Sequence, residues 1–127
     1  MNQEAYSGAD VQFFGIRRMV DEMRRITVPM EVRDMFSMRR RGSVAFKSIH
    51  IAGLGNGVFV FPAPKDVVTG RRLDELGRVV IPFRIAQENS IFCRNWVEMI
   101  PMHLAEHGYG LFVHSVANIH IGESEEA

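Results

Sequence analysis

The chain has 127 residues, 46% of them hydrophobic and 24% charged, which is the composition of one globular domain and is too short for two large ones. Fifteen Lys and Arg residues balance fifteen Asp and Glu residues, and a net charge of zero by itself argues against a nucleic-acid partner. The single cysteine, Cys93, excludes an internal disulfide, and without a long apolar run we expect neither a signal peptide nor a membrane span. These features predict a cytoplasmic protein.

After a polar tail at residues 1–10, the first part of the chain predicts strands, one short helix and a hairpin. Ile26–Val28 is a β-branched triplet, which favours a strand. Pro29 ends this strand and opens a helix, because proline lacks the N–H needed inside a sheet but fits the first helical turn. The hairpin consists of two strands around a glycine-rich turn: Ser43–Ile51, Gly53–Gly57 and Val58–Val60.

The same elements recur, because residues 18–62 align without a gap on residues 71–115 after a shift of 53 positions. Fourteen of the 45 aligned pairs are identical, whereas average composition predicts about three. A unit of this size buries too little apolar surface alone, so the repeats are expected to share one core in a single pseudo-twofold domain. We predict a first repeat at 11–62, a linker at 63–66, a second repeat at 67–115, and tails at 1–10 and 116–127. The second copy contains a strand at Val79–Ile81, Pro82, a helix, and a hairpin from Trp96–Leu104, Glu106–Gly110 and Leu111–Val113.

The strongest signal is a motif that occurs once in each repeat. It reads VDEMRRITVP at Val20–Pro29 and LDELGRVVIP at Leu73–Pro82. The motif resembles that of the SpoVT/AbrB family of DNA-binding regulators, and the resemblance covers both repeats. It implies a mainly β fold with short helices, namely a swapped-hairpin, AbrB-like β-barrel built from two tandem ββαββ repeats in one chain. That arrangement is similar to the fused one of the MraZ branch of the superfamily.

The resemblance also implies which arginines contact DNA. In the family such arginines precede the motif, lie in its turn or lie on the short helix, and here these positions hold Arg18, Arg25, Arg33, Arg71, Arg72 and Arg78. The helix position of the second repeat holds Ala86, so that repeat has lost one contact. Arg24 replaces the usual turn glycine of the first repeat, which adds a positive charge and leaves the conformation of that turn open. We therefore include Arg24 among the DNA-binding residues.

Two aspartates of the motif, Asp21 and Asp74, are expected to have structural roles. Each could accept hydrogen bonds from turn amides or pair with the arginine four residues later. The second arrangement would fix the direction of the Arg25 or Arg78 side chain.

Arginines are distributed unevenly along the chain. They make up thirteen of the fifteen basic residues, and their planar fork suits phosphate oxygens and guanine edges. Between Gly15 and Lys47, nine basic residues accompany four acidic ones, an excess of five. From Val68 to Ser115, five arginines meet five carboxylates. We therefore expect the first repeat to contribute more of the DNA affinity than the second.

These observations predict a transcriptional regulator that binds double-stranded DNA, is associated with the nucleoid and is not an enzyme. No cofactor or metal site is expected: His103 and His107 are four positions apart, but their segment is predicted as strand and turn, not as the helix that would place both rings on one face. Self-association is open. Two alternatives also remain, an antitoxin whose tail binds a toxin and a protein-interaction barrel that does not bind DNA. The short tail after Ser115 weakens the antitoxin interpretation.

Overall fold

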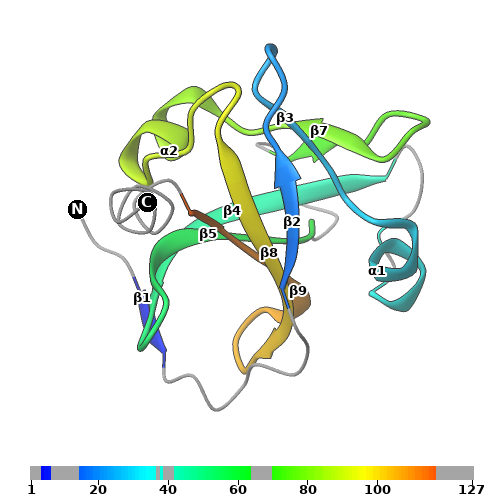
Figure 1. Ribbon diagram of the computed structural model, residues 1–127. Coiled ribbons are helices and arrows are strands. Elements are labelled where there is room, and N and C mark those ends of the chain that lie inside the picture. The colour runs from blue at the N-terminus through cyan, green and yellow to red at the C-terminus, as the bar shows by residue number, and fades with distance from the viewer. Residues whose placement is uncertain (1–3, 7–14, 37, 39–41, 64–69, 117–127) are drawn as a thin grey trace.

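The computed structural model describes residues 4–6, 15–36, 38, 42–63 and 70–116 (Figure 1). The protein is mainly β, with two short helices and a large sheet that curls into a half-barrel. The mainly β class with short helices, expected from the sequence, is thereby confirmed. Apart from Ala63 and Val116, the predicted linker at 63–66 and the predicted tail at 116–127 lie outside the described residues.

Each repeat contributes short strands, one helix and a hairpin. The helices are α1 (Met30–Met35) and α2 (Phe83–Glu88). The strands are β1 (Glu4–Tyr6), β2 (Ile16–Met19), β3 (Arg25–Thr27), β4 (Ser43–Ile51), β5 (Gly55–Pro62), β6 (Arg71–Arg72), β7 (Arg78–Val80), β8 (Trp96–Leu104) and β9 (Gly108–Ser115). The predicted bounds of the first strand in each hairpin, now β4 and β8, are confirmed residue for residue.

Strand β1 lies in the segment that the sequence analysis assigned to a tail. It pairs in parallel with β4, so that Glu4 is opposite Ile49 and Tyr6 is opposite Ile51. A strand of three residues carries no hydrophobic periodicity, and only its pairing with β4 reveals it. Val116, also assigned to a tail, is buried and donates its N–H to the carbonyl of Trp96.

Both helices begin directly after a proline. Pro29 and Pro82 have φ angles of −58° and −55°, and each precedes a helix of six residues. Proline is suited to this place because its φ is already near the helical value and its missing N–H has no partner at a helix start. Val32 of α1 and Ala86 of α2 are buried and attach the two helices to the core.

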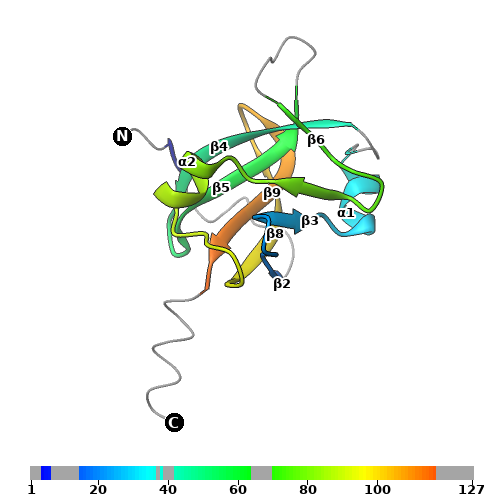
Figure 2. The same ribbon diagram turned by 90° about the horizontal axis from the view of Figure 1, so that it is seen from above.

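The two repeats share their sheets. The large sheet has the strand order β1-β4-β5-β9-β8-β2, and β6 also pairs with β4. A separate two-stranded sheet, the β3–β7 ribbon, lies between α1 and α2, which flank it on opposite sides (Figures 1 and 2). Four pairings join a strand of the first repeat to a strand of the second: β2 with β8, β4 with β6, β3 with β7 and β5 with β9.

Two of these pairings join equivalent residues of the two repeats. Ile26 is opposite Val79 in the ribbon, and Phe59 is opposite Phe112 in the large sheet. The members of each pair are 53 positions apart, the shift that aligns the repeats. An approximate twofold axis therefore relates the paired strands.

The matched glycines Gly57 and Gly110 allow close packing across this axis. A Cβ atom at Gly57 would lie 2.6 Å from Cζ of Phe112, and one at Gly110 would lie 2.6 Å from Cζ of Phe59. Both rings are fully buried. Although the sequence analysis assigned the two glycines to hairpin turns, both lie within strands, and the phenylalanine rings occupy the space that a side chain would need.

Buried apolar side chains form two clusters on the two faces of the large sheet. One cluster includes Ile26 and Val79 of the ribbon together with Val60 of β5. The other includes Phe59 and Phe112. Phe59 and Val60 belong to different clusters because successive strand residues point to opposite faces. The first cluster fastens one face of the ribbon to the body of the protein.

Candidate nucleic-acid interface

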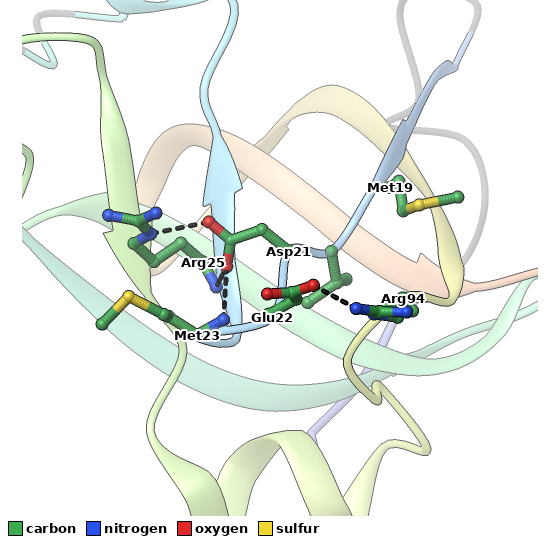
Figure 3. A pocket seen from close by; sticks show the side chains of 7 residues that line it. Met19, Asp21, Glu22, Met23, Arg25 and Arg94 are labelled. Atoms are coloured by element: carbon green, nitrogen blue, oxygen red, sulfur yellow. Dashed lines mark hydrogen bonds and ion pairs between the residues drawn. The ribbon is translucent and has the colours of Figure 1, made fainter.

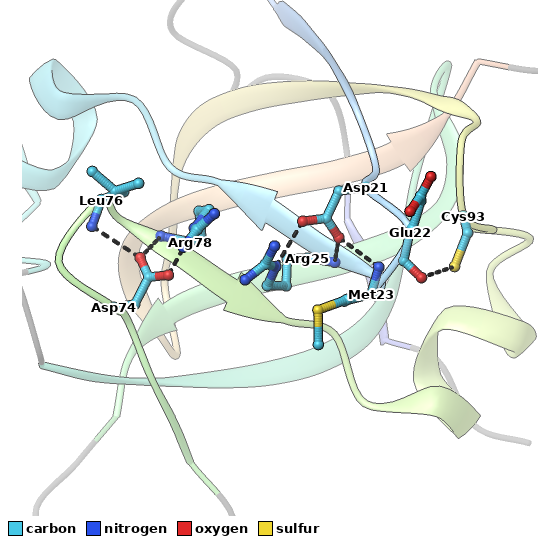
Figure 4. Close-up of polar contacts among 8 residues, drawn as sticks. All are labelled: Asp21, Glu22, Met23, Arg25, Asp74, Leu76, Arg78 and Cys93. Atoms are coloured by element: carbon cyan, nitrogen blue, oxygen red, sulfur yellow. Dashed lines mark hydrogen bonds and ion pairs between the residues drawn. The ribbon is translucent and has the colours of Figure 1, made fainter.

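The β3–β7 ribbon has a buried face and an outer face. Ile26 and Val79 point into the core and are each 1% exposed. Arg25 and Arg78 precede them in their strands and therefore lie on the outer face, where both are half-buried. Figure 4 shows the two arginines next to each other over the ribbon, flanked by their aspartates. The fold thus brings together two arginines that are 53 positions apart in the sequence.

Each of these arginines is held by the aspartate four residues before it. Asp21 Oδ2 accepts a hydrogen bond from Arg25 Nε at 2.6 Å, and its Oδ1 accepts from the amides of Met23 at 2.9 Å and Arg25 at 2.8 Å. Asp74 makes the same three contacts, with Arg78 Nε at 2.7 Å and two turn amides at 2.9 and 2.8 Å. Each aspartate therefore makes both kinds of contact considered from the sequence. Because the ion pair uses Nε, the terminal nitrogens of each arginine lie outside it.

The same hydrogen bonds lower the pKa of both aspartates. Burial alone would raise the pKa of Asp21, but hydrogen bonds from the Arg25 amide, the Arg25 guanidinium and the Met23 amide outweigh it and hold the pKa below 3.8. The pKa of Asp74 is lowered in the same way: burial opposes the shift, and the hydrogen bonds from Arg78 and the turn prevail. Both carboxyl groups are thus charged at neutral pH, where they orient the arginines.

Acid is expected to weaken the fold through these two carboxylates. Because their pKa is lower in the folded chain than in the unfolded chain, their contribution is present above about pH 4 and is lost as the pH falls through the folded pKa. For Asp21→Asn/Asp74→Asn we expect a free energy of unfolding lower by about 1 kcal/mol per site at pH 7, and a shallower decrease below about pH 4. Urea unfolding from pH 7 to pH 3 measures both effects, with Glu106→Gln in an exposed turn as the control. A double variant with the wild-type acid profile would contradict this prediction.

Arg24 adopts the same turn conformation as Gly77, the matching residue of the second repeat. Its φ is 62°, that of Gly77 is 81°, and the N–H of each closes its turn at 3.0 Å. The left-handed conformation costs a residue with a side chain about 1–2 kcal/mol. Two contacts offset this strain: Arg24 Nε donates to the Ile81 carbonyl at 2.8 Å, and the guanidinium lies 5.3 Å from the ring centre of Phe83. Arg24 is therefore held, half-buried, against the start of α2.

Arg33 of α1 lies against the turn of the second repeat. A Cβ atom at Gly77 would be only 2.6 Å from Arg33 Cζ, so the guanidinium covers the glycine directly. Arg33 Nε is buried and has no hydrogen-bond partner among the residues that the structure describes. The side chain as a whole is half-buried.

The other arginines predicted to contact DNA lie on strands next to the ribbon. Arg18 is in β2, Arg71 and Arg72 form β6, and all three are exposed. Strand β2 contacts β3, and strand β6 contacts β7. The predicted arginines therefore lie in the ribbon, at its two ends or on strands that contact it.

An open hollow of about 520 Å³ borders the first turn, and its lining includes Met19, Met23, Arg25 and Arg94 (Figure 3). Arg94, from the loop between α2 and β8, forms an ion pair with Glu22 of this turn. Arg94 is not among the arginines that the sequence predicts to contact DNA. The sequence feature that could have singled out Arg94 is its match with Arg41, the equivalent residue of the first repeat.

His103, His107 and Cys93 have ordinary packing environments. His103 lies edge-on to Tyr109 with ring centres 4.7 Å apart, and His107 lies 4.9 Å from the ring of Phe61. Cys93 is exposed, and its Sγ is 3.5 Å from the carbonyl of Glu22. Within the described part of the chain, no three His, Cys, Asp or Glu side chains are grouped so that they could hold a metal ion.

Comparison of the chain with protein-family models, curated proteins and solved structures finds no match. Among the described residues, neither helix has the length and apolar character needed to cross a membrane. The distinctive feature of the molecule is the arginine-bearing outer face of the β3–β7 ribbon.

Proposed function

We propose that the protein is a transcriptional regulator of the SpoVT/AbrB type that binds double-stranded DNA through the outer face of the β3–β7 ribbon. The observation that carries this proposal is the pair of arginines, Arg25 and Arg78, each oriented by its own aspartate on that face. A two-stranded ribbon is narrow enough to enter the major groove of B-DNA. Its approximate twofold symmetry matches that of a pseudo-palindromic site.

The chemistry of the two ion pairs suits this role. Asp21 and Asp74 bind Nε, so these two ion pairs do not use the terminal nitrogens of Arg25 and Arg78. An arginine fork donates two parallel hydrogen bonds to O6 and N7 of guanine or to phosphate oxygens. Because its aspartate already fixes the side chain, each arginine loses less conformational entropy on binding.

The strand pairings support the finer part of the proposal, a swapped-hairpin barrel made by one chain. Strands β2 and β6 each pair with a hairpin strand of the other repeat, and equivalent residues are opposite each other in β3–β7 and β5–β9. In this interpretation the two tandem repeats of one chain form the barrel that two separate subunits form in other proteins of the SpoVT/AbrB type. Exposed Arg18, Arg71 and Arg72 then contact phosphates beside the groove.

Salt dependence tests the proposal directly. Each phosphate contact releases condensed counterions, so we expect the logarithm of the binding constant to fall linearly with the logarithm of the salt concentration, by about 0.9 for each contact. With several arginines engaged, affinity should decrease by more than about tenfold between 50 and 200 mM salt. Fluorescence anisotropy with a labelled duplex, followed by selection from a random DNA pool, provides the measurement. Absence of binding at the lower salt concentration would overturn the proposal.

A further inference from the structure

The two repeats do not carry their arginines at matching positions near the ribbon. Arg33 of α1 corresponds to Ala86 of α2, whereas Gly77 of the second turn corresponds to Arg24 of the first. By sequence alone, the first repeat has an arginine in both its turn and its helix, and the second repeat has one in neither position. The structure relates these two differences, because each turn packs against the helix of the other repeat.

At one end of the ribbon, α1 supplies the cation. The guanidinium of Arg33 covers the second turn and fills the space above Gly77, where a Cβ atom would lie 2.6 Å from Arg33 Cζ and 2.7 Å from Arg33 Nε. With Arg33 in this position, a side chain at position 77 would displace the guanidinium, and the φ of 81° at Gly77 also favours glycine there.

At the other end, the turn supplies the cation. Arg24 extends toward α2, where its Nε donates to Ile81 O at 2.8 Å and its guanidinium lies over the ring of Phe83. Arg24 and Ala86 line the same hollow, of about 120 Å³. By analogy with Arg33 and Gly77, an arginine at position 86 would need the space that the Cβ atom of Arg24 occupies, so one of the two side chains would have to shift. A small residue on the helix therefore accompanies the arginine in the turn.

We infer that Arg24 takes the place of the arginine missing from α2, so that each end of the ribbon has one guanidinium in the gap between turn and helix. This inference rests on the proposed function where DNA is concerned: Arg24 and Arg33 flank Arg25 and Arg78 and bind phosphates at the two ends of the site. Because Arg24 and Arg33 both belong to the first repeat yet lie at opposite ends, the basic excess of that repeat is not concentrated at one end. The apparent loss of a contact at Ala86 is compensated.

Moving the arginine from the turn to the helix tests the inference. We expect Arg24→Gly to weaken binding to the selected duplex by about tenfold, and Arg24→Gly/Ala86→Arg to restore it to within about threefold of the wild type. Ala86→Arg alone should lower the unfolding midpoint in urea, and Arg24→Gly should relieve that loss. If Arg24→Gly binds as the wild type does, the role of Arg24 at the DNA is wrong. If the double variant is folded but binds no better than Arg24→Gly, an arginine at position 86 does not replace Arg24 and the inference is wrong.

The unfolding measurements need no DNA and separate this inference from the proposed function. Arg24 and an arginine at position 86 are inferred to need the same space. Additive effects of Arg24→Gly and Ala86→Arg on the free energy of unfolding would show that they do not, and would overturn the inference. Non-additive effects would support the inference that the two arginines need the same space. If the wild type at the same time binds no DNA, the proposed function is overturned while that inference stands. Should Ala86→Arg fail to fold, the opposite end provides the same test: Gly77→Arg should be destabilising alone and tolerated with Arg33→Ala.

Discussion

Replacing both Arg25 and Arg78 by alanine is expected to weaken binding to the selected duplex by at least about 30-fold, because each arginine that reads a guanine edge contributes about 1–3 kcal/mol. Both side chains lie on the outer face of the ribbon, and Asp21 and Asp74 hold them there. Because the approximate twofold axis relates the two arginines, each is expected to make an equivalent contact with the DNA, and the double variant removes both contacts. Fluorescence anisotropy at constant salt measures the change.

Two control variants separate the loss of a specific arginine contact from the loss of positive charge. Lys47→Ala removes a positive charge from β4 on the face of the sheet that carries Phe59, away from the ribbon, and should keep wild-type affinity. Arg25→Lys/Arg78→Lys keeps the charge but removes the fork, and should lose more discrimination between sequences than overall affinity. If the double alanine variant is folded and binds as the wild type does, the assignment of these arginines is wrong.

Replacing Phe112 by alanine is expected to lower the free energy of unfolding by about 3–5 kcal/mol, the range for removing a large aromatic side chain from a packed core. The Phe112 side chain is fully buried, lies opposite Phe59 and fills the space above Gly57. Since strands of both repeats build this region, the loss should appear in one cooperative transition. Urea unfolding followed by circular dichroism and by Trp96 fluorescence measures it.

Phe92→Ala provides the matched control, because the same side chain is removed from a position that is 50% exposed. It should cost less than about 1 kcal/mol. Two separate transitions in the wild type, or equal losses for the two variants, would contradict a core shared by the repeats.

Elements that depend on local signals were predictable from the sequence. The β-branched triplets before Pro29 and Pro82 indicate a strand and then a helix. Strands β3 and β7 each begin and end one residue earlier than predicted, and both helices begin directly after the proline. The hairpin strands β4 and β8 were predicted with their observed bounds. Strand β1 was missed because its three residues are recognisable only by their pairing with β4.

The candidate site was predictable in composition but not in geometry. The repeated motif identified Arg25, Arg78 and their aspartates, since both copies carry the same residues at the same spacing. It did not show that Arg24 keeps the left-handed turn of a glycine, because that conformation is stabilised by the distant Ile81 carbonyl and Phe83 ring. Nor did it show that Arg33 packs on Gly77 from another element, in addition to the positive φ that favours glycine there.

By itself, the sequence determined the repeat, the motif, the mainly β class and the inventory of arginines, because each follows from residue identity and local spacing. Only the tertiary structure decided where the charges lie. A net charge of zero, and even an excess of five in one segment of the first repeat, describes stretches of chain and not faces of the molecule. The repeats interleave their strands, so Arg24 and Arg33 of one repeat reach opposite ends of the ribbon, and Arg25 and Arg78 of different repeats lie beside each other on its outer face. Long-range packing places these cations, and no local pattern encodes it.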